Sequence, residues 1–171
     1  QPVYQSGNPT ISTAAMGRVT TIGFCPHNNN TIFVGAPLGG LWRSTNSGAT
    51  WENMNTDNIT SLGVSAVAVH PQDPNTIFIG TGDRDGENTL GKGIYKSTNG
   101  GQTWEAKPLT TNHDKIVHKI YFHPADPDVM AVASNYGVFY SVDGGETWEK
   151  RLTAYIIDME QKPGEPLTLY A

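Results

Sequence analysis

An eight-residue pattern, Ser-x-(Asn/Asp)-x-Gly-x-Thr-Trp, occurs three times in this chain of 171 residues, at positions 44–51, 97–104 and 141–148. A pattern of this length, matched at both ends, indicates tandem repetition, which constrains a fold more strongly than local propensity does. The positions that define it are Ser44, Asn46, Gly48 and Trp51, then Ser97, Asn99, Gly101 and Trp104, then Ser141, Asp143, Gly145 and Trp148.

Three further segments precede each copy of the pattern and have the alternation of strands. In the first unit, Ile22 and Phe24 alternate with other residues before a proline turn, so we expect them on a buried face. The second and third segments cover 31–35 and 40–44 in the first unit, 76–80 and 93–97 in the second, and 129–133 and 137–141 in the third.

The repeated pattern itself predicts a hairpin between the third and fourth strands of each unit. Its Asn or Asp can accept hydrogen bonds from turn amides, and its Gly can supply a positive φ. The closing Trp starts a fourth strand, where the indole can lie across the hairpin. Four antiparallel strands per repeat predict an all-β fold, a β-propeller of four-stranded blades.

The pattern resembles the Asp-box, also called the bacterial neuraminidase repeat, and the resemblance covers residues 17–148. Propellers of this family include sialidases, xyloglucan-cleaving glycoside hydrolases, sortilin-type receptors and photosystem assembly factors. In the family the box is a structural element on the outer side of the blade. The resemblance therefore implies a scaffold role for the boxes.

The domain organisation follows from the repeat. We expect a leader or latch strand at 1–16, a first blade at 17–54, a second at 55–107 with an insertion at 80–93, a third at 108–152, and the first half of a fourth at 153–171. In the fourth unit, residues 155–159 and 167–171 are the expected strands. The chain is then the N-terminal part of a larger propeller.

Composition excludes several classes of protein. The net charge is −5 and the 11 Lys and Arg residues are scattered, which disfavours a nucleic-acid partner. No apolar run approaches the ~20 residues that cross a bilayer, so membrane insertion is not expected. Cys25 is the only cysteine, so the chain forms no internal disulfide. A start at Gln1 fits an exported protein after leader removal, or an internal fragment.

The second unit is longer than the other two. From turn proline to box tryptophan it spans 33 residues, against 25 in the first unit and 24 in the third. The extra residues lie at 80–93, and long loops of repeat proteins often carry function. We expect a ligand-binding loop here, with the candidate residues Asp83, Arg84, Asp85, Glu87 and Asn88.

The same loop has two other interpretations. Asp83, Asp85 and Glu87 at alternate positions could supply oxygen ligands to calcium, although the helix-flanked calcium loop is missing. Alternatively, Asp83 and Asp85 hold a glycine-rich turn through backbone contacts and contacts with Arg84. We expect no other cofactor.

Histidines recur at one repeat position, and this recurrence favours a structural role. Cys25, His70 and His123 each precede the turn proline. A catalytic or metal-binding residue has no reason to recur in every blade. His113, Asp114 and His118 lack a visible third and fourth zinc ligand, so we interpret them as loop and strand residues.

Catalysis is disfavoured by what the enzymes of this class require. Sialidases clamp their substrate with an arginine triad in defined segments, and none of the four arginines here lies in such a segment. Residues 33–42 resemble xyloglucanases, which are expected to have a catalytic Asp where this chain has Pro37. A relocated carboxylate pair that uses Asp83 or Asp85 stays open as the alternative.

The segments 17–19, 35–42 and 80–86 together resemble large bacterial surface proteins, often exported by the type IX pathway. The resemblance implies a secreted or cell-surface protein. We therefore expect a non-catalytic binding or adhesion scaffold for a polysaccharide or a surface protein. The alternatives are a xyloglucanase-like glycoside hydrolase, and cargo or a partner of an outer-membrane secretion complex.

Overall fold

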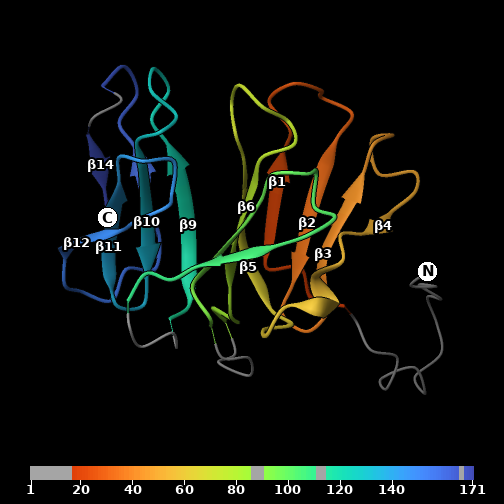
Figure 1. Ribbon diagram of the computed structural model, residues 1–171, viewed down its shortest axis with the longest axis horizontal. Coiled ribbons are helices and arrows are strands. Elements are labelled where there is room, and N and C mark those ends of the chain that lie inside the picture. The colour runs from red at the N-terminus through yellow and green to blue at the C-terminus, as the bar shows by residue number, and fades with distance from the viewer. Residues whose placement is uncertain (1–16, 86–90, 111–114, 166–167) are drawn as a thin grey trace, which may run out of the picture.

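The computed structural model describes residues 17–85, 91–110, 115–165 and 168–171 (Figure 1). The first sheet holds β1 (Thr21–Phe24), β2 (Ile32–Ala36), β3 (Gly40–Ser44) and β4 (Glu52–Asn53). The second holds β5 (Val64–Val69), β6 (Ile77–Thr81), β7 (Ile94–Ser97) and β8 (Glu105–Lys107). The third holds β9 (Val117–Phe122), β10 (Met130–Ser134), β11 (Gly137–Ser141) and β12 (Glu149–Leu152). A two-stranded sheet, β13 (Glu160–Gln161) with β14 (Leu169–Tyr170), follows.

Within each sheet, strands that follow one another in sequence pair antiparallel, so each four-stranded sheet is a meander. β1 lies beside β5, and β5 lies beside β9, which sets the sheets side by side as successive blades. The predicted all-β propeller architecture is confirmed. A short 3-10 turn, η2 (Thr56–Asn58), lies in the connection between the first two sheets.

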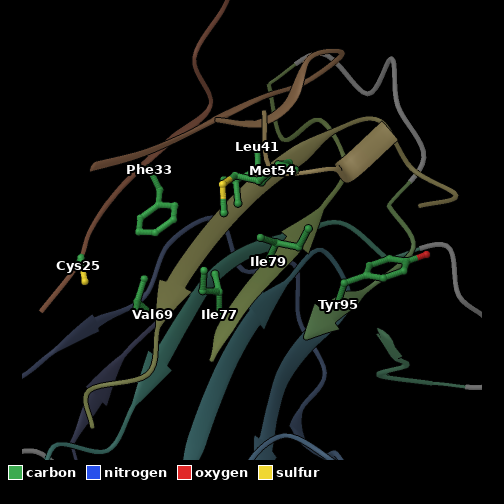
Figure 2. Packing of buried hydrophobic residues seen from close by; sticks show 9 residues of the cluster. Cys25, Phe33, Leu41, Met54, Val69, Ile77, Ile79 and Tyr95 are labelled. Carbon is green, nitrogen blue, oxygen red and sulfur yellow. The ribbon is translucent and has the colours of Figure 1, made fainter. Parts of the chain in front are cut away.

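Apolar side chains of adjacent sheets form the core between the blades. Figure 2 shows residues from the first sheet and its exit segment meeting residues of the second sheet. The first side contributes Cys25, Phe33, Leu41 and Met54, and the second contributes Val69, Ile77, Ile79 and Tyr95. A second cluster repeats this arrangement between the second and third sheets, with Phe78 and Ile94 against Ile120, Met130, Val132 and Phe139.

The expectation that Ile22 and Phe24 face a core is wrong within the described residues. Their side chains are 60% and 67% exposed. Cross-strand pairing places Ile22 beside Val34 and Val34 beside Trp42, on the side of the first sheet away from the second sheet. The equivalent residues of the later sheets are covered because a preceding sheet packs on them.

The fourth unit also departs from its expected strand positions. Residues 155–159 form no strand, and the first strand begins at Glu160. Ile156 and Met159 are buried against Ala131 and Ala133 of β10. The segment therefore packs on the third sheet as a connection before β13 begins.

The two ends of the sheets carry different connections. The β1–β2 and β3–β4 type of connection, including all three boxes, lies at one end. The β2–β3 type and the crossings from one sheet to the next lie at the other end, called here the crossover end (Figure 1). Gly80 and Thr81 belong to β6, so the long connection of the second sheet begins at Gly82, and its described residues 82–85 and 91–93 lie at the crossover end.

Candidate functional site

The polar side chains of the boxes are used within the boxes themselves. In the third box, Ser141 Oγ donates to Asp143 Oδ1 at 2.7 Å, and Asp143 Oδ1 accepts the Thr147 amide at 2.9 Å. The pKa of Asp143 falls to about 2, first because the Thr147 hydroxyl donates to it and then because of the Thr147 amide and Ser141. The box glycines Gly48, Gly101 and Gly145 have φ values of 90°, 86° and 77°. These hydrogen bonds hold the turn in place. They use most of the donors and acceptors of the box side chains, so few are left to bind a ligand.

The second and third boxes also connect their sheets to the preceding sheet by hydrogen bonds. Trp104 Nε1 donates to the Met54 carbonyl at 2.8 Å, from the second sheet to the first. Glu146 of the third box accepts hydrogen bonds from Lys96 at 2.7 Å and from Lys107 at 2.6 Å, both in the second sheet. Hydrogen bonds to Glu105 and Glu146 raise the pKa of the buried Lys107.

The recurring turn position has a structural use in each described sheet. His70 Nδ1 accepts the Gln72 amide at 3.2 Å, and His123 Nδ1 accepts the Asp126 amide at 3.1 Å. Cys25 is buried in the first core cluster. These contacts organise the turns that join the first two strands of each sheet.

The candidate loop is described only as far as Asp85, and Glu87 and Asn88 lie outside the described residues. Asp83 is fully buried, and its carboxylate forms an ion pair with the Arg18 guanidinium of the first sheet's entry segment. Asp83 Oδ1 also accepts the Asp85 amide at 3.2 Å. Asp83 thereby anchors the turn that presents Arg84 and Asp85, both exposed.

The calcium hypothesis gains no geometric support from these positions. Within the described part of the chain, no group of three His, Cys, Asp or Glu side chains could hold a metal ion. One of the three candidate ligands, Asp83, is already paired with a guanidinium. The calcium site stays a prediction.

A hollow of about 200 Å³ opens where this turn meets the segment after β12. Both borders belong to the crossover end of the sheets. The lining residues are Arg84, Asp85, His118, Tyr155, Ile157 and Asp158. A smaller cavity of about 60 Å³ lies between the third sheet and β13–β14 and is lined mainly by apolar groups, which is typical of a packing gap.

His118 is the most buried residue of the hollow, at 3% exposure. Its Nδ1 lies 3.2 Å from the carbonyl oxygen of Ile157, so Nδ1 carries the proton. Burial lowers the pKa of His118, and the positive charge of Arg84 lowers it further, against the opposing hydrogen bond to Ile157. Nε2 is buried and has no hydrogen-bond partner among the described residues. The imidazole is therefore a neutral ring with one spare acceptor.

The repeat shows what is unusual about this histidine. Counted back from the turn proline, His118 occupies the position of Thr20 in the first sheet and Ser65 in the second. Thr20 Oγ1 donates to the Val64 carbonyl at 2.6 Å, and Ser65 Oγ donates to the Val117 carbonyl at 2.6 Å. Each hydroxyl thus bridges to the first strand of the next sheet. His118 makes the corresponding bridge to Ile157 with a larger ring, and this substitution is the signal that the sequence analysis missed.

The carboxylates at the hollow are partly offset by cations. Asp85 Oδ1 lies 3.6 Å from Arg84 Nε, and Asp158 Oδ1 lies 3.5 Å from Lys119 Nζ. The position where xyloglucanases are expected to have an acid is the buried Pro37, in the turn between β2 and β3. The hollow thus combines two carboxylates, one guanidinium, a phenol, a neutral imidazole and an isoleucine side chain.

Two family models match the sequence. The Sortilin-Vps10 model, described as sortilin, neurotensin receptor 3, matches residues 8–107, and the BNR/Asp-box repeat model matches residues 139–150. A xyloglucanase of Acetivibrio thermocellus is 33% identical in an alignment of 104 residues, with 48% of this chain and 12% of that protein covered. The vacuolar protein sorting/targeting protein 10 of Sordaria macrospora is 25% identical over 129 residues, which are 74% of this chain and 8% of that protein. The chain thus spans about a tenth of the length of these relatives.

Solved structures show the same fold. An ancestral GH74 enzyme superposes with a TM-score of 0.65 at 27% identity, covering 78% of this chain and 18% of the enzyme. YCF48 bound to D1 peptide superposes with a TM-score of 0.60 at 15% identity, covering 87% of this chain and 46% of YCF48, a likeness of fold alone.

Among the described residues, no helix is long and apolar enough to cross a membrane. The Sortilin-Vps10 model covers more than half of the chain, the BNR/Asp-box repeat model matches the third box, and the three sheets are four-stranded meanders like the blades of a propeller. The chain is an Asp-box β-propeller chain that belongs to the Sortilin-Vps10 family.

Proposed function

We propose that this propeller is a non-catalytic binding scaffold whose ligand, a polysaccharide or a protein, docks at the crossover end of the blades. One observation carries the proposal: the hollow beside His118 collects polar and aromatic side chains from β9 and from two connections at the crossover end. Polar groups converging on a concave surface are the usual mark of a binding site.

Other polar side chains described above already have partners within the protein, which leaves the hollow as the candidate binding site. The box side chains lock their own turns, and Glu146 fastens the third sheet to the second. Asp83 is buried against Arg18. Xyloglucanases and YCF48 bound to D1 peptide are among the similar proteins, so this fold accommodates polysaccharide and peptide partners in other chains.

A location outside the cell, secreted or on the cell surface, belongs to the same proposal, as does export as cargo of a secretion complex. Its support is the resemblance of residues 17–19, 35–42 and 80–86 to surface proteins. Fractionation of producing cells tests it, and a purely cytosolic protein would contradict it.

Binding is tested with the whole chain. Affinity electrophoresis against a panel of soluble polysaccharides, together with surface plasmon resonance against purified candidate proteins, should show a ligand retained by the wild type. Arg84→Ala should weaken it at least tenfold, because Arg84 borders the hollow. The matched control is Arg151→Ala, an exposed arginine of β12 outside the lining of the hollow. Equal loss in both variants, or no retained ligand in any assay, would contradict the proposal.

A glycoside hydrolase is the second candidate, and it is favoured by the two carboxylates, Asp85 and Asp158, on one hollow. Glycoside hydrolysis generally uses such a pair across the scissile bond. This candidate predicts reducing-sugar release that is abolished in Asp85→Asn and in Asp158→Asn. If the wild type releases no reducing sugar from any polysaccharide of the panel, this candidate fails.

A further inference from the structure

The second box contains the single Asn-Gly pair of the sequence, Asn99 and Gly100, in the turn between β7 and β8. We propose that Asn99 is a site of covalent modification: it loses its amide group when the box opens, and the resulting aspartate is held by the closed box. The modification adds one negative charge where the first two sheets meet, since Arg43 of β3 donates to the Gly100 carbonyl. It does not depend on the ligand proposed above.

The turn itself creates this reactive pair. The residue after the box Asn or Asp has a left-handed backbone in all three boxes, with φ values of 57° at Ser47, 70° at Gly100 and 67° at Gly144. Glycine adopts this conformation without steric cost. Because glycine also lacks a Cβ, nothing hinders its amide nitrogen as it approaches the side-chain carbonyl of the preceding residue. The second box is the one in which this glycine follows an asparagine.

The reaction is an intramolecular displacement. The Gly100 amide nitrogen attacks Cγ of Asn99, its proton passes to the side-chain nitrogen, and the Cγ–Nδ2 bond breaks to release ammonia. A cyclic imide remains between the two residues. Water then opens the ring: cleavage of the new Cγ–N bond gives aspartate, and cleavage of the original peptide bond gives isoaspartate. One water is consumed for each ammonia released, and Asn99 is exposed to the solvent that supplies the water.

In the closed box both reacting groups are engaged with other partners. The Gly100 amide donates to the Asn75 carbonyl at 2.9 Å. Asn99 Oδ1 accepts the Thr103 amide at 3.0 Å, and Asn99 Nδ2 donates to Thr103 Oγ1 at 2.8 Å. Attack on Cγ requires the amide to leave Asn75 and the side chain to turn away from Thr103. The reaction therefore proceeds from a locally opened box, and its rate measures how often the box opens.

The third box shows how the aspartate product fits. Asp143 Oδ1 accepts the Thr147 amide at 2.9 Å, as Asn99 Oδ1 accepts the Thr103 amide at 3.0 Å. The difference lies at the threonine hydroxyl, which donates to Asp143 Oδ2 in one box and accepts from Asn99 Nδ2 in the other. A hydroxyl serves in either role after rotation about its C–O bond. Aspartate at position 99 can therefore form the same turn.

Cations are placed alike beside the two boxes. Arg43 Nη1 donates to the Gly100 carbonyl at 3.3 Å, and Lys96 Nζ donates to the Gly144 carbonyl at 2.9 Å. A carboxylate at position 99 thus lies next to a residue that binds a cation, as Asp143 does. The charge that the reaction creates is therefore placed where the third box already has one.

The isoaspartate product differs because it adds one carbon atom to the main chain. The addition falls between Ser97 and Gly101, which are joined by the 2.8 Å hydrogen bond from the Gly101 amide to Ser97 Oγ. We therefore expect two products of different stability: an aspartate form that closes the box, and an isoaspartate form that leaves it open.

The test follows Asn99 by peptide mass spectrometry of the whole chain, incubated in mildly alkaline buffer with and without urea. Conversion should be at least about tenfold slower in the folded chain than in urea, because the closed box blocks it. Thr103→Val removes the hydroxyl that accepts Asn99 Nδ2 and should raise the folded rate about fivefold, the effect of one hydrogen bond. The matched control is Thr50→Val, which removes the equivalent bond of the first box and should leave the rate at Asn99 unchanged.

A second variant tests the chemistry. Gly100→Ser copies Ser47 of the first box, and a Cβ at Gly100 would meet no atom of a non-adjacent residue closer than 3.6 Å. The variant should therefore fold, and its hindered amide should slow conversion in urea as well as in the folded chain. Conversion that this substitution does not slow would exclude the cyclic imide.

The aspartate product is tested with Asn99→Asp. Its midpoint of urea unfolding at neutral pH should match that of the wild type, whereas aged protein enriched in isoaspartate should unfold at lower urea. A clear loss of stability in Asn99→Asp would show that the box does not hold the product. Equal rates of conversion at Asn99 with and without urea would show that the box does not control the reaction. Either result overturns the proposal.

Discussion

The indole Nε1 of Trp104 donates a 2.8 Å hydrogen bond to the main-chain carbonyl of Met54, across the junction of the first two blades. The box tryptophan therefore contacts the preceding blade as well as its own hairpin. Replacing Trp104 by Phe keeps an aromatic ring and removes this bond. We expect the free energy of unfolding to fall by about 1 kcal/mol, measured by urea unfolding with far-UV circular dichroism.

The first box supplies the control for that experiment. Trp51 occupies the same box position, is 41% exposed, and has no preceding sheet among the described residues. Trp51→Phe should change the free energy of unfolding by less than about 0.5 kcal/mol. Equal effects of the two substitutions would show that the bond to Met54 contributes nothing measurable.

Asp83 should contribute more to the free energy of unfolding than Asp85 does. Its carboxylate is fully buried and paired with Arg18, whereas Asp85 is exposed on the same turn. Asp83→Asn should lower the free energy of unfolding by about 2 kcal/mol, as expected for a lost charged hydrogen bond. Asp85→Asn should stay within about 0.5 kcal/mol of the wild type. A larger loss in Asp85→Asn would reverse the roles assigned to the two carboxylates.

Asp143 should make the third blade sensitive to acid. Hydrogen bonds from Thr147 and Ser141 lower its pKa from 3.8 to about 2 in the folded chain. The stabilisation from the ionised carboxylate is therefore complete above pH 3.8 and is lost as the pH falls toward about 2. Asp143→Asn introduces the residue that the other two boxes have, as Asn46 and Asn99. In this variant the melting temperature should depend less on pH within this window. An unchanged pH profile would contradict the assignment.

His118 should give a second pH dependence of stability, caused by burial of the ring and not by hydrogen bonds to a charged group. Burial lowers its pKa below the ordinary 6.5, so the unfolded chain takes up a proton that the folded chain resists. The free energy of unfolding should be greatest above pH 6.5 and fall below it. Arg84, Asp85 and Asp158 are the charged groups that share the hollow. His118→Phe should remove part of this slope, whereas His27→Gln, at an exposed histidine, should retain it.

Much of the fold could be predicted because it repeats. A box that recurs with its glycine and tryptophan implies a hairpin each time, and four strands per unit follow from the matched segments upstream. The exposure of Ile22 could not be predicted in the same way. Its alternation with Phe24 is that of a buried face, but burial depends on a neighbouring sheet, which local sequence does not describe.

The candidate site was predicted only in part. The long connection directed the prediction to residues 80–93, and Arg84 and Asp85 of this segment line the hollow, but their role in binding stays a prediction. The pairing of Asp83 with Arg18 joins residues 65 positions apart and has no local signal. His118 was detectable. Aligning the three units from their prolines places an imidazole where the other two have hydroxyls, and a difference between repeats is more informative than the shared motif.

The uncovered side of the first sheet has a consequence for symmetry. Ile22, Val34 and Trp42 lie in one row across the first sheet, on the side opposite the one that packs on the second sheet. If a second copy covers this row with the opposite side of its last blade, as successive blades do within the chain, the contact is head-to-tail. Contacts of this kind close into a ring only when the rotation between copies divides a full turn, and otherwise continue as a filament. For the isolated chain, the sizes of the assemblies that form as the protein concentration rises would therefore report the rotation between neighbouring copies.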